Sequence, residues 1–164
     1  MLGGIKMKKR YILFLLSIFL MAIIVLGSAS AFDFGSLFGG DNSSEAQNVT
    51  IDGVDFQIPA GYTENEKLAI NNQTNSSAGI TYTSNGKTFT NDDNDVISII
   101  VALYDGQKVD DEFAGYLGGN KTTYNGQTGY LLENSNIYMF NYARDGKLVI
   151  ITSTDGSIFK DVVI

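Results

Sequence analysis

The sequence contains no cysteine, no histidine, no tryptophan and a single proline, Pro59. Without cysteine the chain has no disulfide bond, no thiol nucleophile and no thiolate metal ligand. Without histidine it has no Ser-His-Asp triad, no imidazole general base and no ordinary zinc hydrolase site. The glycines form neither a G-x-G-x-x-G string nor a P-loop. We therefore assign no catalytic residue and no cofactor from the sequence, and the absences favour a non-enzymatic protein.

Basic residues are few and unevenly placed. Four of the eleven lie in the first ten positions, whereas all eighteen acidic residues follow residue 31. The remainder, 32–164, therefore carries a formal charge of −11. A region this acidic repels phosphate backbones, so nucleic acid is excluded as a partner.

Directly after the basic residues comes an uncharged apolar run, 11–26. A basic start followed by such a run predicts membrane insertion, with the basic end in the cytoplasm. Residues 1–31 are therefore interpreted as a signal peptide or a membrane anchor. Ala29 and Ala31 are the small residues that predict cleavage between Ala31 and Phe32, but the run approaches the length that spans a bilayer, which favours retention. Both alternatives place the remainder outside the cytoplasm, anchored in the cell membrane or secreted.

Export gives a meaning to the Asn-x-Ser/Thr sequons, which are acceptors for glycans in exported chains. We predict them as candidate glycosylation sites. They are Asn42, Asn48, Asn72, Asn75 and Asn120. The polar stretch 71–77 around two of them is expected to be an exposed loop.

Residues 32–48 have the Gly/Ser/Asn composition of a flexible tether. From residue 49 onward, dipeptides that favour type I′ turns recur, which indicates strands joined by tight hairpins. These dipeptides are Asp52-Gly53, Asn85-Gly86, Asp105-Gly106, Asn125-Gly126, Asp145-Gly146 and Asp155-Gly156.

Between the turns, β-branched and aromatic residues predict an antiparallel β meander, with 96–104 as its central strand. Two short helices are expected at 110–117 and at 157–164, the latter with Ser157 as its N-cap. We predict an α+β domain over 49–164, with one or two helices on one face of the sheet and a membrane helix preceding it. An all-β sandwich is the alternative.

Asp92, Asp93 and Asp95 offer the oxygen ligands that calcium prefers, so they are weak candidates for a metal site. They do not fit an EF-hand loop, because Val96 occupies the position of the required glycine. Ser157 and Lys160 match the S-x-x-K string of serine acyltransferases, but the companion motifs are missing and a helix start explains the string better.

The layout resembles small exported or membrane-anchored proteins of methanogenic archaea without an assigned function. The resemblance rests on the N-terminal segment, the Gly-rich tether 32–40, the entry 54–62 and the hairpin 125–130. The stretch 56–62 is also loosely similar to the entry of PsbP-like domains. This second similarity implies a fold and no function.

Three functional hypotheses stay open. The first is a non-enzymatic cell-surface domain that binds a protein, a glycan or the envelope. The second is a hydrolase that uses carboxylates, serine or lysine, and the third is a weak calcium-binding adhesive module.

Overall fold

The structure is a computed structural model that describes residues 45–77 and 79–164. The predictions for the signal or anchor, for cleavage between Ala31 and Phe32, and for Asn42 lie outside the described residues. None of the helices in residues 45–77 and 79–164 has the length and apolar character of a membrane span.

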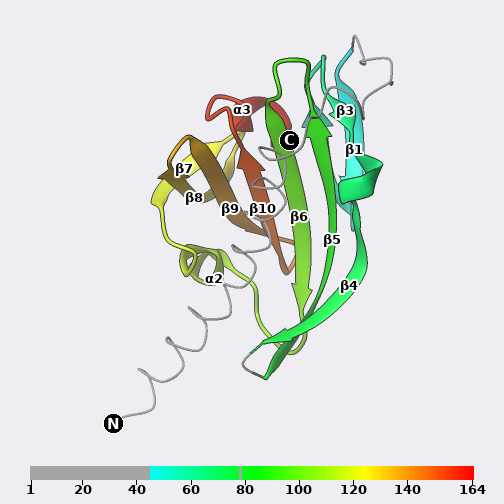
Figure 1. The fold of residues 1–164 in the computed structure, drawn as a ribbon. Coiled ribbons are helices and arrows are strands. Elements are labelled where there is room, and N and C mark those ends of the chain that lie inside the picture. Colours follow the sequence, from blue (N-terminus) through cyan, green and yellow to red (C-terminus); the bar gives the residue numbers. More distant parts are fainter. Residues whose placement is uncertain (1–44, 78) are drawn as a thin grey trace.

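The described chain forms an antiparallel β-structure with short helices (Figure 1). In chain order the elements are β1 (Gln47–Ile51), β2 (Val54–Ile58), β3 (Thr63–Glu64), the 3₁₀ helix η2 (Glu66–Leu68), β4 (Ile70–Ser77), β5 (Ile80–Thr90), β6 (Val96–Tyr104), α2 (Asp111–Gly115), β7 (Asn120–Tyr124), β8 (Gln127–Asn134), β9 (Ile137–Arg144), β10 (Lys147–Ser153) and α3 (Phe159–Val162). β1 and β2 form a separate hairpin. The other strands form one sheet in the order β3-β5-β6-β10-β9-β8-β7, and β4 also pairs with β5. The predicted antiparallel, β-rich fold is confirmed.

Both faces of the large sheet are buried at its centre, which explains why β6 is apolar along nearly its whole length. On one face, the hairpin face, the β1–β2 hairpin and α3 pack against the sheet, with Phe56 and Phe159 fully buried. On the opposite face, the α2 face, Phe113 of α2 packs against Tyr104 with ring centroids 4.9 Å apart. The sequence prediction placed both helices on one face, and this detail is wrong. The side chains that β6 and β10 present on the α2 face are also apolar, so this face must be buried by α2.

The two helices begin differently. Asp110, expected in the first turn of the helix, is instead the N-cap of α2, because its side chain accepts a hydrogen bond from the Phe113 N–H at 3.1 Å. Ser157 is not the N-cap of α3, contrary to our expectation. Its N–H and its hydroxyl both donate to Asp155 at 2.8 Å, so Asp155 organises the turn that precedes the helix.

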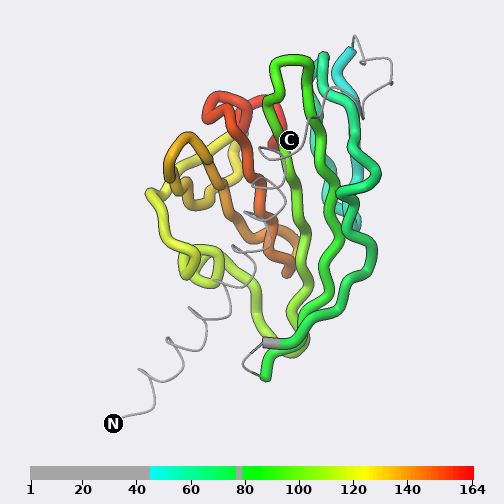
Figure 2. The backbone as a smooth tube through the Cα atoms, in the orientation of Figure 1, coloured from blue at the N-terminus to red at the C-terminus, as the bar shows by residue number. Residues whose placement is uncertain are grey.

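Three of the predicted hairpin turns are confirmed. Both residues of Asp52-Gly53, Asn125-Gly126 and Asp145-Gly146 have the positive φ that a type I′ turn needs. The chain path in Figure 2 shows these tight reversals. A further turn with two positive φ values, at Ser135 and Asn136, joins β8 to β9 and was not predicted.

The prediction of a turn at Asn85-Gly86 is wrong. β5 runs without interruption through both residues, and Gly86 lies opposite Ile100 of β6. A Cβ at Gly86 would lie 2.9 Å from the carbonyl oxygen of Ile99, so this glycine serves close strand packing instead of a reversal. The chain reverses later, at Asn91–Asp95, where Asn91 accepts a hydrogen bond from the Asp95 N–H.

Candidate binding groove

A polar groove of about 540 Å³ opens beside the β1–β2 turn on the hairpin face. Its walls come from β1, β3, η2, the start of β4 and the middle of β5. The lining residues are Thr50, Ile51, Asp52, Glu64, Glu66, Ala69, Ile70, Asn71, Asn72, Asn85, Gly86 and Lys87. Its volume lies in the range of small-ligand sites. Most of its polar groups are carboxylates and side-chain amides.

Two of the three carboxylates in the groove are already paired with lysines. Lys87 lies 2.7 Å from Glu64, which ties the middle of β5 to β3. Lys147 lies 3.2 Å from Asp52, and its ammonium also donates to the Asp52 carbonyl oxygen. The carboxylate of Glu66, at the exposed start of η2, is the third. Internal pairing leaves the groove only mildly acidic.

A β-bulge shapes the wall that β4 contributes. The pairing of β4 with β5 shifts between Ile70 and Gln73, so the intervening residues leave the regular ladder. Asn72 takes a positive φ of 47° there, and its N–H donates to the side-chain oxygen of Asn85 at 2.8 Å. The side chain of Asn85 therefore fixes the bulge and keeps its own amide group at the groove.

The chemistry of the groove suits uncharged hydroxyl groups. Side-chain amides such as those of Asn71 and Asn85 both donate and accept hydrogen bonds, and a sugar hydroxyl does the same. The carboxylate of Glu66 accepts two or more further hydrogen bonds. Because the paired carboxylates are already neutralised, a cationic ligand gains little here.

A second hollow of about 470 Å³ lies beside the start of α2 and the β9–β10 turn. Its acidic residues include Asp110, whose pKa is lowered by hydrogen bonds from Lys108 and from the Phe113 N–H. The carboxylate of Asp110 therefore already forms an ion pair with the Lys108 ammonium at 3.0 Å and caps α2. This hollow is therefore structural, and its residues provide a control surface for binding experiments.

The acidic residues that the sequence suggested for calcium lie in the β5–β6 turn. Asp95 is engaged within the protein: its carboxylate accepts hydrogen bonds from Asn91 at 3.2 Å and from Thr154 at 3.2 Å. Asp92 and Asp93 precede it on the same turn. Among the described residues, no group of three acidic side chains is placed to hold a metal ion.

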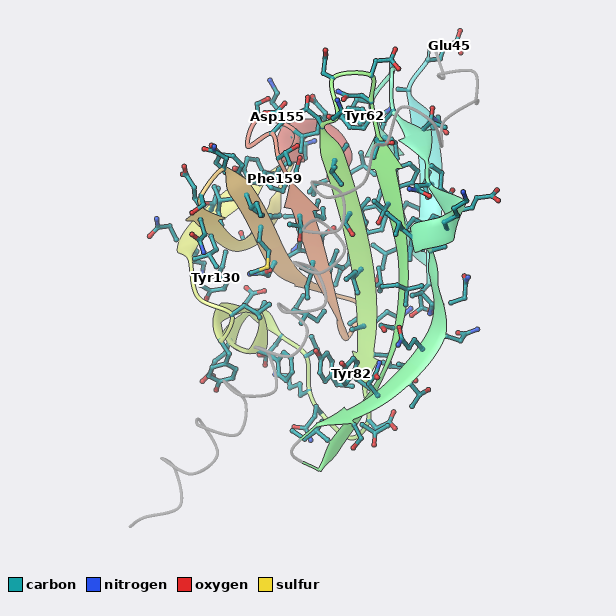
Figure 3. The ribbon with its side chains drawn as sticks, in the orientation of Figure 1. Glu45, Tyr62, Tyr82, Tyr130, Asp155 and Phe159 are labelled. Carbon is teal, nitrogen blue, oxygen red and sulfur yellow. The ribbon has the colours of Figure 1, made fainter. Side chains whose placement is uncertain are left out.

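This same end of the sheet carries a buried tyrosine. Tyr62 is 5% exposed, and Figure 3 shows it near Asp155. Burial, together with the nearby carboxylates of Asp95, Asp155 and Asp93, raises the pKa of Tyr62 to about 12. The fold therefore keeps the Tyr62 phenol protonated among these carboxylates.

The sequons that fall in the described residues all lie on strands. Asn48 is on β1, Asn72 and Asn75 are on β4, and Asn120 is on β7. The loop expected over 71–77 is therefore wrong, because this stretch belongs to β4. Its residues alternate too weakly in polarity to be recognised as a strand from the sequence.

The groove is not predictable from the sequence. Its residues come from separate segments, and none of these segments carries a motif. The pairing of β4 with β5 and the position of the β1–β2 turn bring them together. Comparison with known proteins gives no match among protein-family models, curated proteins or solved structures.

Proposed function

We propose that the chain is a non-enzymatic domain outside the cytoplasm that binds a neutral, hydroxyl-rich glycan of the cell envelope in the groove beside the β1–β2 turn. One observation carries the proposal: the groove presents side-chain amides and a carboxylate, while two of its three carboxylates are paired with lysines. The resemblance to exported archaeal proteins agrees with this location and adds nothing on the ligand.

The chemistry favours a glycan over a protein partner. A protein interface usually has an apolar centre of aromatic and aliphatic side chains. The groove instead has Ile51, Ala69 and Ile70 as its apolar lining, and Ile51 is only 4% exposed. Polar groups therefore dominate what a ligand meets.

Binding to oligosaccharides tests the proposal directly. Protein made in a bacterial host without N-glycosylation is applied to an array of neutral and acidic oligosaccharides. We expect retention of neutral glycans and weaker retention of acidic ones, because the groove keeps a residual negative charge. N71A and E66Q are each expected to weaken binding about tenfold, the loss that about 1.4 kcal/mol produces. E112Q, in the hollow beside α2, is the matched control and should bind like the wild type.

Two results would contradict the proposal. If neither glycan class is retained, or if N71A and E66Q with unchanged melting temperatures bind as the wild type does, the groove is not the site. Cleavage of the bound oligosaccharide would instead support the alternative of a carboxylate- or serine-dependent hydrolase.

The location is part of the proposal and has its own test. Cell fractionation and N-terminal sequencing of the mature protein separate the two forms. An intact Met1 in the membrane fraction indicates a retained anchor, and Phe32 as the first residue in the medium indicates secretion. Recovery of the full chain in the cytoplasm would contradict both.

A further inference from the structure

The sequons of the described residues lie on strands that pair on one side only. Asn48 is on β1, which pairs with β2, and Asn120 is on β7, which pairs with β8. Asn72 and Asn75 are on β4, which pairs with β5. The inner strands β5, β6, β8, β9 and β10 contain none of these sequons.

An unpaired strand edge is a liability for a secreted domain. Its free N–H and C=O groups are a template for pairing with another chain, and proteins normally block such edges. β4 is polar after Ile70 and has no charged residue. β7 has one lysine, Lys121. Apart from Glu64 on the two-residue β3, the charged side chains that commonly protect edges are therefore scarce on the borders of the large sheet.

The acceptor amides differ in accessibility. The residues Asn48, Asn72 and Asn120 are exposed. On the two regular strands β1 and β7, the residue two positions later lies on the same side of the strand, so the sequon threonine accompanies the amide. At Asn72 the bulge turns the residue out of the ladder.

Asn75 is the exception. Its side-chain nitrogen is buried and has no hydrogen-bond partner, and the residue lies opposite Tyr82, which is 3% exposed. A sugar on this nitrogen has no room in the folded domain. The structure therefore separates accessible sequons from a buried one, although the sequence presents them as equivalent.

We propose that Asn48, Asn72 and Asn120 carry N-linked glycans that block the free edges of β1, β4 and β7, and that Asn75 stays unmodified. In the reaction the side-chain nitrogen forms a bond to C1 of a sugar carried on a lipid phosphate. The bond between C1 and the phosphate oxygen breaks, the lipid phosphate leaves, and a carboxylate of the membrane transferase takes the amide proton. The modification requires that the domain is exported from the cytoplasm, as proposed, but does not require that the groove binds a ligand.

Glycopeptide mass spectrometry of protein isolated from the cells that make it tests the sites. We expect a glycan mass on the peptides of Asn48, Asn72 and Asn120 and the bare peptide for Asn75. Bare peptides throughout an exported protein would overturn the proposal while leaving the proposed location intact. A glycan on Asn75 with the other three bare would overturn the assignment of sites.

The edge-blocking role needs a second measurement, by light scattering in the native host. The N48Q/N72Q/N120Q variant should self-associate at concentrations at which the wild type and the matched N75Q variant stay dispersed. In a bacterial host without N-glycosylation, the variant and the wild type should associate alike, because neither carries sugar. A glycosylated wild type and a dispersed triple variant in the native host would overturn the role of the sugars at the edges.

Discussion

The side-chain amide of Asn125 donates a hydrogen bond to the carbonyl oxygen of Val163, 38 residues further along the chain, at 2.8 Å. The same nitrogen donates to the carbonyl oxygen of Lys160 at 2.7 Å. These carbonyls belong to the end of α3, where a helix has no internal donors left for them. One turn residue therefore closes the β7–β8 hairpin and fastens the C-terminal helix to it.

Replacing Asn125 by aspartate should destabilise the protein by about 1–3 kcal/mol, because the two hydrogen bonds that the Asn125 amide donates become contacts between oxygens. Aspartate still tolerates the positive φ of this position, so the turn itself is retained. Urea unfolding followed by circular dichroism measures the change. N136D is the control, since Asn136 has a similar φ of 67° in the exposed β8–β9 turn. Equal losses in the two variants would contradict the role assigned to Asn125.

G129A should destabilise the protein more than G115A. A Cβ at Gly129 would meet the backbone oxygen of Asn141 and the ring of Phe140, which is fully buried. We expect a loss of about 1–3 kcal/mol from this overpacking. At Gly115 the obstacle is the ring of Tyr130, a half-buried side chain that rotates, and alanine favours the helix by about 1 kcal/mol. Thermal unfolding orders the two variants, and a larger loss for G115A would refute the packing argument.

The stability of the protein should fall at alkaline pH partly through Tyr62. Its pKa is raised in the fold to about 12 from 10.0, so the unfolded chain releases this proton first as the pH rises. The contribution of Tyr62 is therefore complete below pH 10 and is lost between about pH 10 and 12. Urea unfolding at pH 8 and pH 11 should show a smaller loss for Y62F than for the wild type. Equal losses of stability in Y62F and the wild type between pH 8 and pH 11 would show that the fold does not hold Tyr62 protonated.

Millimolar calcium should leave the melting temperature unchanged. Asp95 already accepts hydrogen bonds from Asn91 and Thr154, and Asp155 accepts those of Ser157. An ion would have to replace these bonds, and a ligand that stabilises must bind the folded state preferentially. Differential scanning calorimetry with and without calcium decides the point. If calcium raises the melting temperature of the wild type but not that of the D93N variant, the hypothesis of a calcium-binding module is restored.

A glycan on Asn72 should weaken ligand binding in the groove, since Asn72 lines it. The expected result is tighter binding of neutral oligosaccharides by N72Q than by wild type when both come from the native host. In protein from a bacterial host the two should bind alike. Surface plasmon resonance on both preparations makes the comparison. Identical affinities in the native preparations, with Asn72 glycosylated, would show that the sugar points away from the groove.

Short-range features of the fold are predictable from the sequence. Asp52-Gly53 and Asp145-Gly146 reverse the chain as expected, because the preference for positive φ belongs to the dipeptide itself. Asp110 caps α2 for a similar local reason. Asn85-Gly86 has the same local preference, yet it lies within β5. There the pairing of β5 with both β4 and β6 outweighs the preference of two residues.

The candidate site depends even more on contacts that the local sequence does not predict. Glu64 and Lys87 are 23 positions apart, and nothing in either segment predicts that their side chains meet at 2.7 Å. Nor does the sequence separate Asn72 from Asn75, which have the same motif. Burial of the Asn75 side-chain nitrogen distinguishes them, and burial depends on which face of a strand a neighbour covers.

The sequence by itself determined the chemistry that is missing, since no fold supplies a thiol or an imidazole to a chain without cysteine and histidine. It also determined the antiparallel character of the sheet, through turns that form locally. Only the tertiary structure decided that the helices lie on opposite faces, that the groove exists, and which acceptor amide is buried. These features depend on contacts between residues far apart in the chain, and such contacts are set by packing the whole core.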